Sequence, residues 1–172
     1  MAHSLIDPYT LEELASRARD TPPGCLVEVG VYQGGSAAYL HAVAVEQNRK
    51  LFLYDTFTGI PERSDIDVHQ INDFADTSID LARAAAPSAE IVVGIFPASL
   101  VPMPPIAFVH VDCDQYASVK ACCEVLGPLM VPGGMMWFDD YACLDGATAA
   151  IKEMFEGRIE CSTTGNKAIV RF

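Results

Sequence analysis

The alternation of short apolar runs with segments of helical spacing constrains the fold of this chain most strongly. The runs typical of buried strands lie at residues 25–30, 51–55, 91–94, 106–111 and 135–138. The predicted helices lie at residues 8–19, 34–47, 81–86, 118–126 and 147–155. Two last strands, 158–162 and 167–172, flank a predicted hairpin turn at Thr163–Asn166. This pattern predicts a doubly wound α/β fold with a mostly parallel, seven-stranded sheet and an antiparallel C-terminal hairpin.

Size and composition exclude several classes of protein. A chain of 172 residues suits a single domain over residues 1–172. We expect neither a signal peptide nor a membrane partner, because the first residues lack a basic start and no apolar run approaches the ~18 residues of a spanning helix. A net charge of −12 argues against a nucleic-acid partner. The six cysteines form no C-x-x-C pair, so we expect buried free thiols in a reducing cytoplasm.

A glycine-containing segment, Glu28–Ser36, follows the first predicted strand and opens the next helix. Gly30 permits a tight turn, and Gly34 and Gly35 let a ligand approach backbone N–H groups at the helix start. The glycine spacing differs from the G-x-G-x-x-G of dinucleotide enzymes. Asp55 ends the second strand, where a ribose-binding acid belongs in a doubly wound sheet. The alternative is a strand–helix turn that binds no ligand.

Four carboxylates follow two other predicted strands, and we expect these strands to be neighbours in the sheet. Asp112 and Asp114 come after one strand, and Asp139 and Asp140 come after the other. Because adjacent strands are about 5 Å apart, the acids would repel one another unless a cation lay among them. Oxygen ligands favour Mg²⁺, Ca²⁺ or Mn²⁺. The alternative is that these aspartates are helix caps or turn residues.

Four motifs in order resemble those of the macrocin O-methyltransferase family of magnesium-dependent sugar methyltransferases. They are Val27–Ser36, Tyr54–Pro61, the D-x-D-x-Y of Asp112–Tyr116, and the P-G-G…D-D-Y of Pro132–Tyr141. The resemblance implies a Rossmann-like class I domain that binds S-adenosyl-L-methionine (SAM). The cofactor-binding residues it implies are Glu28, Gly30, Tyr32, Gly34, Gly35, Ser36, Asp55 and Phe57. It also implies Asp112, Asp139 and Asp140 as ligands of Mg²⁺ or another hard divalent cation, and Asp114 as the general base.

The expected activity is transfer of the SAM methyl group to a hydroxyl of a small molecule, either a sugar or a catechol-like diol. Three alternatives are a SAM-binding module without turnover, a magnesium-dependent phosphatase and an NAD-dependent oxidoreductase. The region before the first helix is short, which suggests that a second copy of the chain closes the pocket. Residues 61–78 form either a lid or a solvated loop. We interpret His69 as exposed and His110 as a core histidine with satisfied hydrogen bonds.

Overall fold

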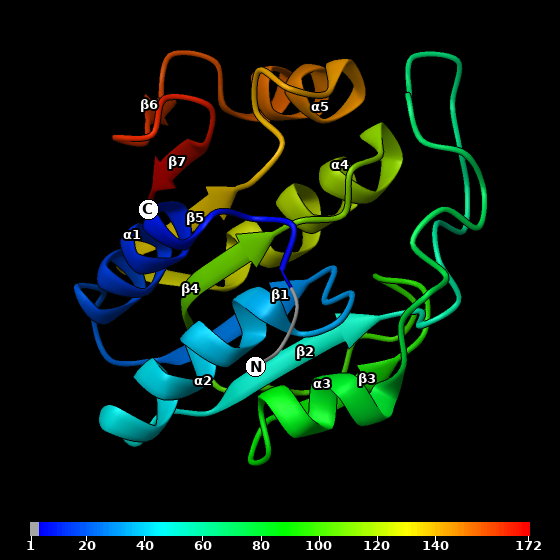
Figure 1. The fold of residues 1–172 in the computed structure, drawn as a ribbon. Coiled ribbons are helices and arrows are strands. Elements are labelled where there is room, and N and C mark those ends of the chain that lie inside the picture. The colour runs from blue at the N-terminus through cyan, green and yellow to red at the C-terminus, as the bar shows by residue number, and fades with distance from the viewer. Residues whose placement is uncertain (1–3) are drawn as a thin grey trace.

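A seven-stranded sheet forms the centre of the molecule in the computed structural model, which describes residues 4–172 (Figure 1). The strand order is β3-β2-β1-β4-β5-β7-β6. The strands are β1 Cys25–Val29, β2 Leu51–Asp55, β3 Glu90–Val93, β4 Ile106–Val111, β5 Met130–Phe138, β6 Glu160–Cys161 and β7 Ala168–Arg171. The first five are parallel, and β7 runs antiparallel between β5 and β6. The doubly wound sheet with its antiparallel hairpin is therefore confirmed.

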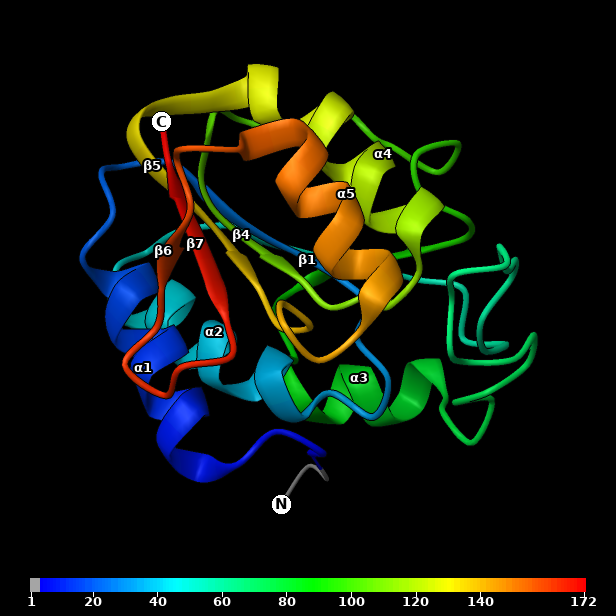
Figure 2. The ribbon, with the colours of Figure 1, turned by 90° about the horizontal axis from the view of Figure 1, so that it is seen from above.

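Helices cover both faces of the sheet. They are α1 Pro8–Arg19, α2 Gly35–Glu46, α3 Ile79–Ala85, α4 Tyr116–Leu126 and α5 Asp145–Phe155, with a short 3-10 turn η1 at Gly127–Leu129. Figure 2 shows α1, α2 and α3 on one face and α4 and α5 on the other. Each face has its own buried apolar cluster, because the strands carry apolar side chains on both sides. Within residues 4–172, no helix is long and apolar enough to cross a membrane.

Three helices, α3, α4 and α5, begin two residues earlier than the apolar spacing predicted. The Ser78 hydroxyl accepts a hydrogen bond from the Leu81 N–H, so α3 starts at Ile79. The N–H of Tyr116 donates to the Asp67 carboxylate at 2.8 Å, so α4 starts at Tyr116. This second acceptor comes from 49 residues away in the sequence, and local spacing carries no sign of it.

The strand order reverses between β1 and β4, and the two strands come very close together where they end. Gly30 has φ +89°, and a Cβ atom placed on it would lie 1.8 Å from the Asp112 carbonyl oxygen. Only glycine fits there. Ligands of doubly wound sheets bind at such a switch point, beyond the carboxyl ends of the strands. The glycine segment and the first pair of predicted site aspartates therefore meet at this position.

Candidate active site

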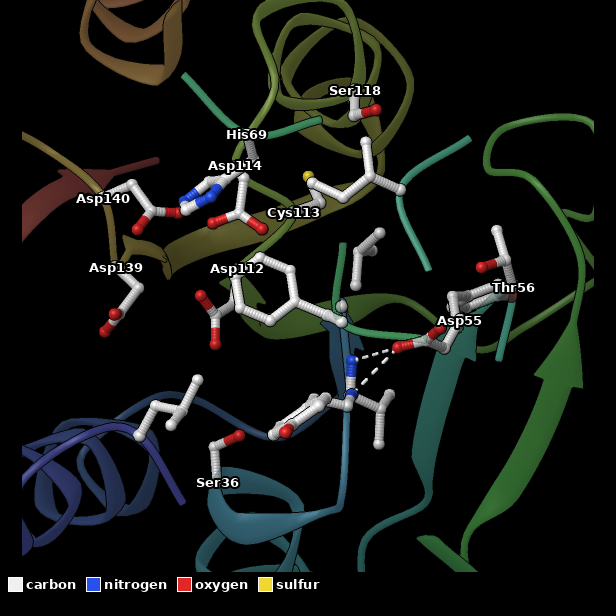
Figure 3. Close-up of a pocket in the computed structure, with 18 of the residues that line it drawn as sticks. Ser36, Asp55, Thr56, His69, Asp112, Cys113, Asp114, Ser118, Asp139 and Asp140 are labelled. Atoms are coloured by element: carbon white, nitrogen blue, oxygen red, sulfur yellow. Dashed lines mark hydrogen bonds between the residues drawn. The ribbon is translucent and has the colours of Figure 1, made fainter. Parts of the chain in front are cut away.

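A cavity of about 650 Å³ lies over the carboxyl ends of the parallel strands. Its walls come from the β1–α2 loop, the ends of β2, β4 and β5, the segment after β3, and residues 4–7. Figure 3 shows Asp112, Asp114, Asp139 and Asp140 toward one end of this cavity and Asp55 toward the other. The two halves of the predicted site therefore share one space.

Asp55 fixes the shape of the β1–α2 loop. One of its oxygens accepts hydrogen bonds from the backbone N–H groups of Val31 and Tyr32, at 2.7 and 2.9 Å (Figure 3). The other accepts from the Phe57 N–H at 2.7 Å. Tyr32 has φ +49° and Phe57 has φ +53°, so the carboxylate holds both residues in a left-handed backbone conformation that residues other than glycine rarely adopt.

Five of the eight predicted cofactor residues line the cavity: Gly30, Tyr32, Gly35, Ser36 and Asp55. Glu28, Gly34 and Phe57 are not part of its described lining. A Cβ on Gly34 would come within 2.7 Å of the Ala85 Cβ, so this glycine makes room for α3. Phe57 packs against the apolar cluster beneath α1, α2 and α3. The structure therefore assigns packing contacts to Gly34 and Phe57, and their predicted cofactor role stays a prediction.

Glu28 lies inside the sheet and forms a buried pair with His110. Both side chains are fully buried, and the Glu28 Oε1–His110 Nδ1 distance is 2.8 Å. Among residues 4–172, Glu28 Oε2 and His110 Nε2 have no hydrogen-bond partner. His110 is a core residue as interpreted, but only one of its ring nitrogens is satisfied. The predicted contact of Glu28 with SAM stays a prediction.

Three of the four predicted carboxylates form a compact group. Asp112, Asp114 and Asp140 each offer an oxygen, and these oxygens lie within 4.8 Å of one another. Asp139 lies beside them but is held differently, since its Oδ2 atom is 2.7 Å from the Nζ atom of Lys167. The sequence predicted Asp139 as a metal ligand and Asp114 as a separate base. The structure instead groups Asp114 with Asp112 and Asp140, and both predicted roles stay predictions.

The carboxyl groups of this cluster are harder to ionise than ordinary ones. Burial, followed by the charges of neighbouring aspartates, raises the pKa of Asp114 to about 8 and that of Asp140 to about 6. The same causes raise the pKa of Asp112. Burial lowers the pKa of Lys167. The charge of Asp139 and its hydrogen bond to the ammonium group outweigh burial, so the lysine pKa lies above its usual value. A cation in the cluster would relieve the part of this effect that comes from repulsion between the aspartates.

Residues 61–78, here called the strap, lie beyond the end of β2 (Figure 1). The D-x-D-x-Y motif ties the strap down at two points. The Gln115 side chain donates to the backbone carbonyls of Glu62 and His69, at 3.0 and 3.3 Å. Asp67 is 4% exposed and accepts from the Tyr116 N–H and from Ser64. Gln115 and Tyr116 of the motif thus hold the strap in place beside the cavity.

The strap contributes aromatic side chains to the cavity wall. Phe74 packs edge-on against Tyr32 and against the His69 ring, with ring centroids 5.8 and 4.9 Å apart. All three line the cavity. His69 was interpreted as solvent-exposed, but its side chain is only 29% exposed. The sequence signal that could have found it was a histidine and a phenylalanine in an otherwise acidic, polar segment.

Lys167 also lines the cavity and was missed. It is 8% exposed and directly follows the predicted hairpin turn. Nothing in the local sequence shows that this turn brings the lysine to Asp139. A basic residue at the start of a strand that neighbours an acidic strand end is the only signal available.

Comparison with known proteins decides the family. A family model described as Macrocin-O-methyltransferase (TylF) matches residues 2–160. The chain belongs to this family. The resemblance found in the motifs is thereby confirmed, and with it the expectation of an O-methyltransferase enzyme.

Two curated relatives are named O-methyltransferases, and the name of the first includes a rhamnosyl group. The 8-demethyl-8-(2,3-dimethoxy-alpha-L-rhamnosyl)-tetracenomycin-C 4'-O-methyltransferase of Streptomyces olivaceus is 28% identical over 92% of this chain and 69% of its own length. The mycinamicin III 3''-O-methyltransferase of Micromonospora griseorubida is 25% identical over 89% of this chain and 70% of its own length.

Solved structures support the fold. The O-methyltransferase NovP superposes with a TM-score of 0.85 at 22% identity, covering 99% of this chain and 82% of its own. The calicheamicin methyltransferase CalS11 gives a TM-score of 0.74 at 20% identity, covering 95% of this chain and 77% of its own. An O-methyltransferase from Bacillus cereus solved with S-adenosylhomocysteine gives 0.64 at 17% identity, over 100% of this chain and 84% of its own.

Proposed function

We propose that this enzyme transfers the methyl group of SAM to a hydroxyl group of a sugar carried by a small molecule, such as a glycosylated antibiotic precursor. The observation that carries the proposal is the single cavity, which joins the β1–α2 loop and Asp55 to the four aspartates of β4 and β5. The rhamnosyl group in the name of the Streptomyces olivaceus relative favours a sugar as the acceptor.

The donor half of the cavity would hold SAM. Gly35 and Ser36 line the cavity at the start of α2, where the first backbone N–H groups of a helix have no partner within the helix. Asp55 would accept from the ribose hydroxyls. The Gly94 N–H bonds to the Asp55 backbone carbonyl at 3.0 Å, which brings Ile95 and Phe96 to this side of the cavity. These two apolar side chains would flank the adenine ring.

The acceptor half fits a hard divalent cation such as Mg²⁺. Within the group of three carboxylates, Asp112 and Asp140 would supply oxygen ligands. A buried oxygen of Asp140 and one of Asp139 have no hydrogen-bond partner among residues 4–172. Asp112 and Asp140 belong both to the predicted metal set and to this geometric group, so we assign them first. When bound, the ion would lower the pKa of an acceptor hydroxyl and orient it.

Asp114 would take the proton of the acceptor hydroxyl. It lines the cavity and lies beside Asp112 and Asp140, so its carboxylate would be within reach of a hydroxyl held at the cation. The hydroxyl oxygen would then attack the methyl carbon, and the sulfur–carbon bond would break in line with the attack. The protein would accelerate this step mainly by aligning the oxygen, carbon and sulfur atoms.

The test is methyl transfer from isotope-labelled SAM to a panel of rhamnosylated polyketides, free sugars and catechols, with and without a chelator. We expect labelled product with the glycosylated acceptors and its loss when the divalent ion is removed. SAM binding without product from any acceptor would support the module without turnover. Labelled product only from catechols would contradict the sugar assignment.

A further inference from the structure

We propose that His69 is a specificity-determining residue, whose Nε2 atom binds a second hydroxyl of the acceptor, one that is not methylated. The inference rests on the proposed function, because it concerns the acceptor of that reaction. It narrows the acceptor to a ring that carries at least two free hydroxyl groups, as a sugar does, and it makes a compound with a single hydroxyl a poor acceptor.

His69 is the polar side chain that the strap presents to the cavity. The strap residues that line the cavity are Pro61, His69 and Phe74. Of these, only the histidine can form a hydrogen bond with its side chain. Within residues 4–172, the ion-pair contact of its ring is made by Nδ1, which lies 3.7 Å from the Oδ2 atom of Asp73. The other ring nitrogen, Nε2, keeps its hydrogen-bonding capacity for a ligand.

Asp73 orients the His69 ring. Its Oδ2 atom accepts a hydrogen bond from the Gln70 backbone N–H at 2.7 Å, which fixes the carboxylate that Nδ1 faces. Because Nδ1 is directed at the strap itself, the far end of the ring, with Nε2, is left to the cavity. A hydroxyl group suits Nε2 in either tautomer of the imidazole, since a hydroxyl can both donate and accept a hydrogen bond.

His69 lies on the acceptor side of the cavity. Its backbone carbonyl accepts a hydrogen bond from the Gln115 side chain at 3.3 Å, and Gln115 directly follows Asp114. Figure 3 shows His69 and Asp114 toward the same end of the cavity and Asp55 toward the other. A hydroxyl that loses its proton to Asp114 and a second hydroxyl of the same ring would therefore both lie at this end.

The strap holds His69 in place before an acceptor binds. Phe74 packs edge-on between the rings of His69 and Tyr32, with centroid distances of 4.9 and 5.8 Å. The Tyr32 hydroxyl donates to the Asp76 carboxylate at 2.7 Å, and the Thr77 hydroxyl donates to the Tyr32 carbonyl. Together with the bond to the His69 carbonyl, these contacts tie the strap on both sides of the ring. A preformed contact of this kind discriminates between acceptors, because little free energy is lost in ordering it.

The charge of the strap favours a neutral group at His69 over a phosphate or a carboxylate. Residues 61–78 contain five acidic residues and one arginine. This excess of negative charge repels an anionic group. The hydroxyls of a sugar are neutral, so they meet no such repulsion.

The experiment measures kcat/KM for a rhamnoside and for analogues that each lack one hydroxyl. With the wild type, kcat/KM for one analogue that is still methylated should fall about five- to tenfold below the parent, because its hydrogen bond to His69 is missing. His69→Phe keeps a ring against Phe74 but has no ring nitrogen, so it should lose about the same factor on the parent and no longer distinguish that analogue. His69→Gln places a hydrogen-bonding group near the position of Nε2 and should retain the distinction. His41→Phe changes a histidine outside the described cavity lining and is the control.

Two outcomes of the kinetics would overturn the inference. One is a wild type that methylates every reactive analogue as efficiently as the parent, and the other is a folded His69→Phe protein that distinguishes the analogues as the wild type does. SAM affinity, measured by calorimetry, should be unchanged in His69→Phe. A fall in SAM affinity that matches the loss in kcat/KM would place His69 at the donor and would also contradict the inference.

The parent rhamnoside separates this inference from the proposed function. Absence of product from the parent with the wild type would contradict the proposed function and the inference together. Normal turnover of the parent without discrimination among the analogues would contradict the inference alone.

Discussion

Gly30 is the residue where the ends of β1 and β4 leave no space for a side chain. A Cβ there would lie 1.8 Å from the Asp112 carbonyl oxygen, and the residue has φ +89°. We predict that Gly30→Ala destabilises the protein by more than the ~1–3 kcal/mol of backbone strain alone, because β4 must also shift. Urea unfolding measures this. Gly157→Ala is the matched control, since Gly157 has φ +79° with nothing within 4 Å of its Cβ position. Equal losses in the two variants would contradict the close-approach argument.

Asp114 carries the second prediction at this scale. Asp114→Asn should lower kcat by about 10²- to 10⁴-fold, even at saturating Mg²⁺, because the proton acceptor is lost. SAM affinity should not change, since Asp114 belongs to the acceptor half. Ser118→Ala changes another residue of the cavity wall and should keep nearly full activity. Steady-state kinetics measures this effect. Normal turnover by Asp114→Asn would show that Asp114 is not the base.

At the same scale, the sequence predicts some site residues better than others. Asp112 and Asp139 could be placed together because each follows a buried strand and the two strands were expected to be neighbours. Lys167 could not be paired with Asp139, since that contact depends on how the hairpin is anchored to α1. Glu28 was placed correctly at the end of β1, but its pairing with His110 depends on the register of β1 and β4.

At the scale of elements, the strap and α4 depend on each other through Asp67. Asp67→Ala leaves the N–H groups of Tyr116 and Ser64 without their acceptor, which should cost about 1–3 kcal/mol of stability. We also predict a higher KM for the acceptor and an unchanged Kd for SAM, because the strap carries the wall formed by His69 and Phe74. Asp65→Ala, at an exposed position of the same strap, is the control. An unchanged acceptor KM in folded Asp67→Ala would show that the strap does not shape the acceptor site.

Element boundaries followed the sequence where the determinants are local. Helix α1 and strands β2 and β4 lie where the apolar spacing predicted them. Strand β5 begins at Met130, five residues before the predicted start, because Met130 already pairs with Ile106 of β4. The pairing register then shifts, and β5 pairs again from Met135, which lies opposite Phe108. The sequence does not distinguish a lid from a solvated loop for the strap, because its anchoring depends on long-range hydrogen bonds from Gln115 to the strap and from Tyr116 to Asp67.

For the whole molecule, the cluster predicts how stability depends on pH. Asp114 and Asp140 have raised pKa values of about 8 and about 6 in the folded state, against 3.8 for an ordinary aspartate. The folded state therefore binds more protons than the unfolded state between about pH 4 and pH 8, and stability falls as the pH rises through this window.

We predict that the metal-free protein loses at least about 1 kcal/mol of unfolding free energy between about pH 5.5 and pH 8.5. Asp114→Asn should reduce this slope, and Mg²⁺ should reduce it in the wild type. The carboxyls with lowered pKa, such as Asp7 and Glu13, titrate below the window and do not contribute. Urea unfolding across the range measures the slope. A stability that rises with pH in the metal-free protein would contradict the charge repulsion.

The overall fold was predictable because its determinants repeat along the chain. Each parallel strand is apolar on both faces, and this alone requires helices on both sides of the sheet. The site was predictable only as far as strand ends determine it. The contacts that complete it come from the strap and from the hairpin, and both are long-range.

The most direct test of the central claim is a crystal structure with S-adenosylhomocysteine, Mg²⁺ and a rhamnosylated acceptor. The claim is that one cavity brings a methyl donor beside Asp55 to a hydroxyl beside the acidic cluster. We predict the ribose at Asp55, the sulfur directed toward the cluster, and an acceptor oxygen within hydrogen-bond distance of Asp114. A nucleoside bound away from Asp55, or an acceptor hydroxyl remote from the cluster, would contradict this account.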